Sequence, residues 1–461
     1  MKLPPGPSSL VEFFQMLLSR KRHPIKLYES IFKKYGDIVY FAFGPYKFAM
    51  LNEADAIEQV LHTEARNFTK SSGYERFKLI VGNGLLVSEG EVWKRQRRLL
   101  SWAFSPRHIE QIHPIMVKES LDMMERWRNQ AEIDLAEEMN FITLQIISVS
   151  LFGKSQIKGS RDIRQAMQNI LKYLQTTRHL WIQLLLTPFP FSDKRAIALK
   201  IEKLLPLKSS REFFRSINII DQIVNNMIDE RKKAEKTENF LDTLIGATDT
   251  EDQSQMTNKQ LRDEVVNMLI AGHETTANAL TWTWHQLLKY PEVMLKVKDE
   301  LKKSVKGMVP NYEELASLHY TQAVFEESMR LYPPFWRISR KNKEQTTINN
   351  YDIPAGTNII ASIYTMQRKE QYWTDAHSFR PERFLQTNRN VLRKIFLPFG
   401  AGPRACIGAH MATIEALTIM ATVLKHYEFE KKFEQDPEYF MSLTLQPKEG
   451  CKVRLKKNGE I

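Results

Sequence analysis

The sequence has very little cysteine, and it lacks the features that divide a chain into separate modules. Cys406 and Cys451 are its only two cysteines in 461 residues, so at most one disulfide could form and a disulfide-stabilised scaffold is excluded. This usage is typical of a reducing compartment, and we expect a cytoplasmic protein. No Gly/Ser-rich linker interrupts the chain and no long repeat recurs. We therefore expect one domain over residues 1–461.

Long hydrophobic runs are missing as well. No stretch approaches the roughly 18 apolar residues that a membrane-crossing helix needs. The N-terminus also lacks the apolar core of a signal peptide. The sequence thus predicts a soluble chain, with peripheral membrane association as an alternative. A membrane anchor is expected only if the chain is a shortened form.

Charge is not concentrated in one part of the sequence. The formal net charge is +12, but the 66 Lys and Arg residues are spread among 54 acidic ones, so nucleic-acid binding is not expected. The densest basic cluster, defined here as Lys94, Arg95, Arg97 and Arg98, has two interpretations. It is either a solvated helix face or a docking surface for an acidic protein partner.

The hydrophobic pattern predicts a mainly α fold with small β-sheets. Residues 38–43 and 47–51 alternate as a hairpin across Gly44-Pro45, which places a small sheet at about residues 30–65. A helical period dominates from about 66 to 335. Short strand patterns return at 346–349 and 357–363, within a sheet and cysteine-loop region over about 336–461.

The segment from Phe399 to Gly408 presents a single cysteine among glycines, directly before a helical pattern. A thiol binds metal only as a thiolate, which is favoured beside cations and at helix N-termini, and Arg404 and the following helix supply both. Glycines permit backbone conformations closed to other residues, so the loop can approach a planar cofactor. The glycines are Gly400, Gly402 and Gly408. Haem fits this arrangement, because it is a planar cofactor whose iron can be ligated by one cysteine. A thiolate ligand on that iron favours O–O cleavage. The alternative is a buried, inert cysteine beside a turn.

Five positions of this segment resemble the haem-binding signature of the cytochromes P-450, the haem-thiolate monooxygenases. They are Phe399, Gly402, Arg404, Cys406 and Gly408. The resemblance implies a non-covalent haem b whose iron is ligated by Cys406, with Phe399 and Arg404 among the cofactor-binding residues, and O2 as co-substrate. It also implies a long helix crossing the distal face of the haem.

A helix pattern with capping-box spacing begins at Thr257 and continues until the residue before Pro291. Its centre, Ala271-Gly-His-Glu-Thr-Thr276, resembles the oxygen-activation motif of the family. Glycine is costly inside a helix, so Gly272 indicates a close approach there. Thr275 is expected to donate a hydrogen bond toward dioxygen or to order a water, and Glu274 to relay protons from solvent. The alternative is ordinary helix residues, with the threonine hydroxyl bonded to the carbonyl four residues earlier.

Two other interpretations of this motif are excluded by its residues. His273-Glu274 opens a zinc-hydrolase pattern, but Ala277 stands where the second histidine is required. Ala271 also occupies the position where some fatty-acid hydroxylases of the family carry a glutamate esterified to haem, so covalent attachment is not expected.

A second helix, over about residues 321–331, carries Glu327 and Arg330 three residues apart, where opposite charges can pair. The pair resembles the buried Glu-x-x-Arg pair of the family, which is joined by the arginine at position 383. The resemblance implies a structural role for Glu327, Arg330 and Arg383. Trp93 and Arg97 share a helix face and, with Arg340 and Arg404, resemble the family's ligands of the haem propionates.

These motifs together predict a monomeric haem-thiolate monooxygenase that oxidises a C–H bond or double bond of a hydrophobic substrate. Resemblance to the fatty-acid-oxidising branch of the family suggests a fatty acid as substrate. No flavin or iron-sulfur signature follows the cysteine loop, so electrons should come from a separate ferredoxin, flavodoxin or flavoprotein reductase. The docking surface would be the basic cluster.

Several alternatives stay open from the sequence. A haem-thiolate isomerase or dehydratase, a peroxide-using hydroxylase, and a haem sensor would share the cysteine loop. The apolar stretch 180–191 is expected either to pack in the core or, by resemblance, to lie near a substrate entrance that touches a membrane. The opening residues 1–7, MKLPPGP, resemble the hinge that follows the membrane anchor of microsomal relatives.

Overall fold

The computed structural model of the chain describes residues 2–7, 24–43, 46–153, 160–174, 208–233, 239–441 and 443–457, together with residues 197 and 201. The apolar stretch 180–191 lies outside these residues. The chain forms two compact units. The first comprises Met1–Tyr74, Leu100–Ile147 and Ala271–Ile461, and the second comprises Glu75–Leu99 and Ser148–Ile270. The expectation of a single domain over residues 1–461 stays a prediction.

The first unit contains all of the named strands among the described residues, with helices between them. Its strands are β1 (Ile38–Phe43), β2 (Tyr46–Leu51), β3 (Phe68–Lys70), β4 (Glu132–Asp134), β5 (Arg337–Asn342), β6 (Thr346–Ile348), β7 (Tyr351–Ile353), β8 (Asn358–Ser362), β9 (Tyr427–Lys431), β10 (Tyr439–Met441), β11 (Leu445–Pro447) and β12 (Lys452–Lys457). Its helices are α2 (Pro24–Tyr35), α3 (Ala54–Glu58), α6 (Pro106–Trp127), α14 (Pro291–Ser304), α15 (Tyr312–Leu315), α16 (His319–Leu331), α17 (Ile363–Met366), α18 (Glu382–Gln386), α19 (Arg389–Ile395) and α20 (Ala409–His426).

The largest sheet of this unit has the strand order β1-β2-β8-β5-β3. β1 and β2 pair antiparallel from Ile38 opposite Leu51 to Phe43 opposite Tyr46, so the predicted hairpin is confirmed. β2 pairs parallel with β8, a strand more than 300 residues later in the chain. Smaller sheets join β4-β12-β9, β10-β11 and β6-β7. The sequence could not reveal the parallel pairing, because nothing local specifies it.

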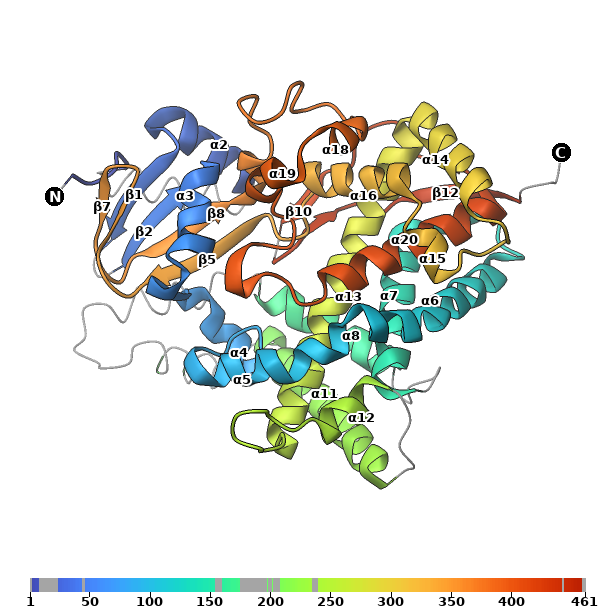
Figure 1. The fold of residues 1–461 in the computed structure, drawn as a ribbon, viewed down its shortest axis with the longest axis horizontal. Coiled ribbons are helices and arrows are strands. Elements are labelled where there is room, and N and C mark those ends of the chain that lie inside the picture. The colour runs from blue at the N-terminus through green and yellow to red at the C-terminus, as the bar shows by residue number, and fades with distance from the viewer. Residues whose placement is uncertain are drawn as a thin grey trace. The chain divides into compact units, whose positions relative to one another are not determined.

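Helices cover both faces of the large sheet. Successive residues of a strand point to opposite faces, so neighbouring residues pack toward different helices. Val39, Met50 and Ile360 pack toward helix α2 on one face. Ala49 and Ile359 pack toward α3 on the other face. Figure 1 shows both helices beside this sheet. The strands are therefore hydrophobic on both sides.

The second unit is helical over its described residues. Its helices are α4 (Glu75–Val81), α5 (Gly90–Ser101, which ends in the first unit), α8 (Ser160–Leu174), α11 (Lys208–Lys233) and α12 (Phe240–Gly246). α8 packs on α11, where the rings of Tyr173 and Phe213 stack with centroids 3.9 Å apart. Together the two units confirm the prediction of a mainly α fold with small sheets.

The longest helix of the described residues is α13 (Asn258–Lys289), which has 32 residues. Its residues up to Ile270 belong to the second unit, and those from Ala271 belong to the first. The helix begins as the sequence predicts. The N–H of Gln260 donates to the Thr257 hydroxyl over 3.2 Å, and the N–H of Thr257 donates to the Gln260 side chain over 2.9 Å. This reciprocal capping satisfies two backbone donors that the helix would otherwise leave unpaired. The helix ends just before Pro291, the first residue of α14.

One helix differs from the expectation about hydrophobic runs. Among the described residues, α7 (Leu135–Phe152) is long and apolar enough to cross a membrane, although 61% of this stretch is buried inside the protein. The statement that no run of about 18 residues has this character is therefore wrong. Core helices of soluble proteins reach the same composition, because they are buried on most sides.

Candidate active site

The cysteine loop connects α19 to α20 in the first unit. The N–H of Cys406 donates to the carbonyl of Phe399 over 2.9 Å, which closes the loop. Gly402 has φ +68°, and an ideal Cβ there would lie only 2.0 Å from the carbonyl oxygen of Leu61. Only glycine permits both the backbone angle and the close approach. Gly408 has φ −88°, which any residue can adopt, so the expected special backbone is not found at that position.

The two cysteines differ in accessibility. Neither forms a disulfide; Cys406 is exposed and Cys451 is buried. Burial raises the pKa of the Cys451 thiol, and this keeps it protonated. Cys406 lies three residues before the start of α20, near the positive end of the helix dipole, which favours a thiolate. Of the two thiols, only Cys406 is placed to bind a ligand.

Helix α13 has one uncovered patch in the middle of a buried stretch. From Asp263 to Leu288 every residue is buried except three: Ala271 is exposed, and Gly272 and Thr275 are partly exposed. These residues lie at i, i+1 and i+4 and therefore share one side of the helix. A core helix that opens only at this point can border the space of a bound cofactor or substrate.

The side chains around this patch have partners of their own. The Thr275 hydroxyl donates to the carbonyl of Ala271 over 2.7 Å, within its own helix. An added Cβ at Gly272 would lie 3.4 Å from Ile147 of α7, which is an ordinary contact distance, so the close approach expected at Gly272 stays a prediction. His273 contacts the carbonyl of Asn140 through Nε2 over 3.0 Å. Among the described residues no group of His, Cys, Asp and Glu could hold a metal ion.

Glu274 does not face solvent. Its side chain is 4% exposed, and its Oε1 accepts hydrogen bonds from the Thr444 hydroxyl, over 2.6 Å, and from the Gln446 side-chain amide. Burial raises the pKa of this carboxyl, and the two donors oppose the shift only in part. The expected proton relay through Glu274 stays a prediction. No sequence signal points to Thr444 or Gln446 as its partners, because they lie 170 and 172 residues away.

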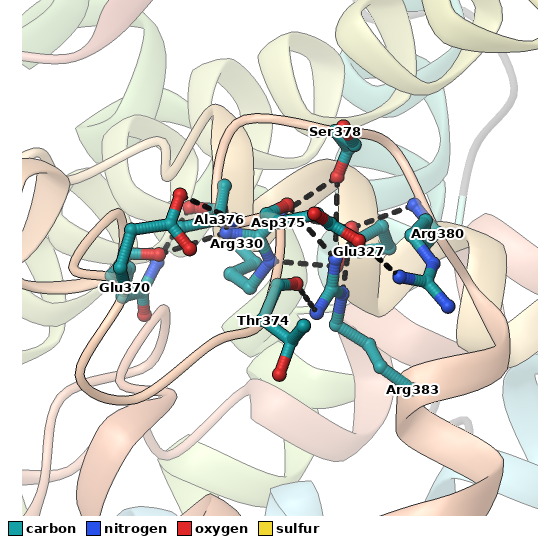
Figure 2. Close-up of polar contacts among 10 residues, drawn as sticks. Glu327, Arg330, Glu370, Thr374, Asp375, Ala376, Ser378, Arg380 and Arg383 are labelled. Atoms are coloured by element: carbon teal, nitrogen blue, oxygen red, sulfur yellow. Dashed lines mark hydrogen bonds and ion pairs between the residues drawn. The ribbon is translucent and has the colours of Figure 1, made fainter.

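A buried ion cluster stabilises the segments that precede the cysteine loop. Arg330 donates to both carboxylate oxygens of Glu327, over 2.7 and 2.9 Å, and Arg383 donates to Oε1 over 3.1 Å. Figure 2 shows the arginines converging on Glu327. Arg330 also donates to the carbonyls of Gln367 and Ala376. Glu327 and Arg330 have 0% exposed side chains, so the cluster is buried. It connects α16 to Arg383 of α18 and to the chain that precedes α18.

Comparison with known proteins agrees with this arrangement of an accessible cysteine loop, a long core helix and a buried Glu-Arg cluster. The sequence profile described as cytochrome P-450 matches residues 4–454. The chain belongs to the cytochrome P-450 family. It is a haem-thiolate monooxygenase, and its cofactor is a thiolate-ligated haem.

The relatives of this cytochrome P-450 include bacterial and plant enzymes. It is 30% identical to cyclooctat-9-en-7-ol 5-monooxygenase of Streptomyces melanosporofaciens, over 88% of this chain and 85% of the relative. It is 27% identical to pentalenene oxygenase of Streptomyces avermitilis, over 94% and 93%. It is 31% identical to cytokinin hydroxylase of Arabidopsis thaliana, over 93% and 82%. These names describe oxygenation, so the isomerase, dehydratase and sensor alternatives are not retained.

The residues of this cytochrome P-450 fit a haem group at two places. The exposed thiol of Cys406 provides the expected ligand, and the uncovered patch of α13 leaves a helix side free for a large planar partner. Arg340, a predicted propionate ligand, lies on β5 with 7% exposure and donates to the Ser339 carbonyl over 3.0 Å. Arg404 is partly buried in the cysteine loop, and Trp93 and Arg97 are partly buried one turn apart on α5. The propionate roles of these four residues stay predictions.

The basic cluster of this cytochrome P-450 is largely neutralised by acidic residues of the second unit. Arg98 pairs with Asp249 over 3.1 Å and with Glu251 over 2.9 Å, and Arg95 pairs with Asp252 over 3.6 Å. Backbone N–H donors and Arg98 hold the pKa of Asp249 below its ordinary value.

Lys94 of the cluster pairs with Glu91 over 2.7 Å. Acidic partners thus reduce the free charge of Lys94, Arg95 and Arg98, and docking at the basic cluster stays a prediction. The acidic turn lies 151 residues after Arg98, too far along the chain for the sequence to indicate it.

Proposed function

We propose that this cytochrome P-450 hydroxylates a C–H bond of a compact alicyclic substrate of the terpene class. The names of two of its relatives support this choice, because cyclooctat-9-en-7-ol and pentalenene are terpenes. No relative named above has a fatty acid in its name, so the fatty-acid substrate that the sequence suggested has no support. The proposed substrate class therefore rests on the similar relatives. The proposed reaction class rests on the accessible thiol of Cys406.

In this proposal the Cys406 thiolate would bind the haem iron. When bound, the haem would supply the activation of O2. Phe399 and Arg404 of the cysteine loop, and Ala271 and Gly272 of α13, would contact the cofactor. Arg340, with Trp93 and Arg97, would bind the propionates through charged and indole donors. The cofactor would thus be held by residues from several separate segments.

Thr275 and Glu274 would hold and deliver the protons that the reaction consumes. The Thr275 hydroxyl lies on the uncovered patch and keeps acceptor lone pairs available to a water, although its proton is donated to Ala271. The buried Glu274 carboxyl holds a proton to higher pH than an exposed glutamate would. A buried acid beside a partly exposed hydroxyl can deliver protons while bulk water stays excluded.

A redox partner delivers the electrons, as the family requires. We propose that it is a separate ferredoxin, flavodoxin or flavoprotein reductase. The pairing of Lys94, Arg95 and Arg98 with acids leaves these three side chains little free charge for attracting an acidic protein. Docking at the basic cluster would therefore depend weakly on those charges.

Spectral titration of the ferric protein tests the substrate class. Terpene hydrocarbons and alcohols should displace the water on the iron and shift the haem absorption at low concentration. Fatty acids of matched carbon number should do so only at much higher concentration. Tighter binding of fatty acids than of every terpene tested would contradict the proposal.

The ligand assignment has a matched control within the chain. Cys406→Ser should abolish the absorption signature of a thiolate-ligated haem, whereas Cys451→Ser should retain it because that thiol is buried elsewhere. Retention of the thiolate signature by Cys406→Ser would contradict the role of Cys406.

A further inference from the structure

A polar stripe on α13 binds three consecutive residues of the β10–β11 region. The stripe consists of Glu274, Asn278 and Trp282, which lie at i, i+4 and i+8 and therefore on one side of the helix. The residues that it binds are Thr444, Leu445 and Gln446, called here the clamp segment. The clamp segment is fixed in turn, because the N–H of Leu445 donates to the carbonyl of Pro334 over 3.0 Å.

Each member of the stripe makes a hydrogen bond to the clamp segment. Asn278 donates to the Thr444 hydroxyl over 3.2 Å, and the Trp282 indole donates to the Leu445 carbonyl over 3.1 Å. Glu274 accepts from both Thr444 and Gln446. The Gln446 amide also donates to the Thr444 hydroxyl over 3.1 Å. Thr444 therefore accepts two hydrogen bonds and directs its own proton at Glu274.

The surroundings of Glu274 are polar but uncharged. Among the described residues, burial is the main cause of its raised pKa, and the Thr444 and Gln446 donors are the causes that lower it. Tyr332 and His285 are titratable side chains that contact Trp282 of the stripe, with ring centroids 4.0 and 5.9 Å from the indole. Burial raises the pKa of Tyr332 and lowers the pKa of His285 to about 4, so both are neutral near pH 7. Burial raises the pKa of the Glu274 carboxyl, and the two neutral donors oppose that rise.

We propose that Thr444 and Gln446 are positioning residues for the proton donor Glu274. They hold its carboxyl on the side of α13 that faces the clamp segment, next to the uncovered patch that carries Thr275. The clamp segment thereby sets both the orientation of the acid and the ease with which it releases a proton. This inference rests on the proposed catalytic role of Glu274.

Infrared difference spectroscopy tests the inference without turnover. The carbonyl stretch of the protonated Glu274 carboxyl is identified as the band lost in Glu274→Gln, and its pH titration reports the pKa. Thr444→Val and Gln446→Leu each remove one donor to Glu274, so each should shift the titration upward by about one pH unit. Thr444→Ser keeps the hydroxyl and should restore the parent value. Thr281→Val is the matched control. It removes a buried hydroxyl of α13 that donates to the Ala277 carbonyl and not to Glu274.

The same variants are then compared in turnover. Thr444→Val and Gln446→Leu should change the solvent isotope effect and the fraction of reductant that forms product, and Thr281→Val should not. If Glu274→Gln alters coupling but both clamp variants match the parent in titration and in coupling, the positioning role is overturned and the role of Glu274 stands. If Glu274→Gln itself leaves coupling unchanged, the proposed catalytic role fails. Thermal melts identify a variant that is simply misfolded, and the other of the two clamp variants, Thr444→Val or Gln446→Leu, then carries the comparison.

Discussion

Glu327 and Glu274 are both buried glutamates of the first unit, yet their surroundings are opposite. Glu327 is enclosed by the guanidinium groups of Arg330 and Arg383, which balance its charge. Glu274 meets only a hydroxyl and an amide, and burial raises the pKa of its carboxyl. The neighbours, and not burial alone, thus decide whether a buried acid serves as a fixed anion or as a holder of a proton.

Glu264 extends the comparison to the second unit. It lies on the same helix as Glu274 and is 0% exposed. One of its oxygens accepts from the N–H of Leu85 over 3.1 Å, and burial raises its pKa to about 8. Helix α13 therefore carries two buried acids with neutral donors, whereas the acid of α16 is paired with cations.

The largest expected effect on stability comes from removing an arginine that pairs with Glu327, the charged member of this comparison. Arg330→Ala leaves the Glu327 charge buried with Arg383 as its remaining cation, and should lower the free energy of unfolding by about 3 to 5 kcal/mol. Urea unfolding measures the difference. Arg380→Ala is the control, because Arg380 contacts Glu327 through its backbone N–H while its side chain is 52% exposed and pairs with Asp375. A loss under 1 kcal/mol in Arg330→Ala would contradict a structural role.

The pH dependence of stability separates the two kinds of buried acid. Glu264 binds a proton in the folded state between its ordinary pKa near 4.5 and about 8, where the unfolded chain has released it. Stability should therefore fall as pH rises through this window, by at most about 1.4 kcal/mol per pH unit. Glu264→Gln removes this contribution, so its stability relative to the parent should increase from pH 5 to pH 8. Parallel curves for the two proteins in urea titrations would contradict the assignment.

Thr275→Ala tests whether the proton held by Glu274 reaches the site through the neighbouring hydroxyl. We expect the fraction of reductant that forms product to fall about tenfold and peroxide release to rise, with little change in stability. Thr283→Ala is a matched control on the same helix, since its hydroxyl also donates to the carbonyl four residues earlier but is fully buried. Equal coupling in Thr275→Ala and Thr283→Ala would remove the role assigned to Thr275.

The smallest effect is expected where charges pair near the surface. Arg98 is 35% exposed beside Asp249 and Glu251, so Arg98→Ala should change the free energy of unfolding by less than about 1 kcal/mol. Its electron-transfer rate and salt dependence should stay near those of the parent, because this charge is already neutralised. A large fall in that rate would restore the basic cluster as the docking surface.

The sequence allowed good prediction wherever the interaction is local. The start of α13 followed from the Thr257-Gln260 capping spacing, its end from Pro291, and the β1–β2 hairpin from alternating residues around a turn. The pairing of Glu327 with Arg330 followed from their separation of three residues on a helix. In each case the partners are close along the chain, so the backbone geometry fixes their distance.

The sequence could not predict contacts whose partners lie far away along the chain. Glu274 is covered by the clamp segment, 170 residues later. Arg98 meets an acidic turn 151 residues later. The backbone of Leu61 makes the close contact at Gly402, and the approach of a cofactor to this loop stays a prediction.

The sequence by itself determined the family, the haem-thiolate chemistry and the residue types of the site, because a thiol ligand, a helix hydroxyl and an acid are recognisable from short motifs. Only the tertiary structure decided the state of those groups. It exposed Cys406 and buried Cys451, uncovered α13 at three residues, and surrounded one glutamate with arginines and another with neutral donors. Burial and the identity of distant neighbours set desolvation and charge balance, and those quantities do not exist before the chain has folded.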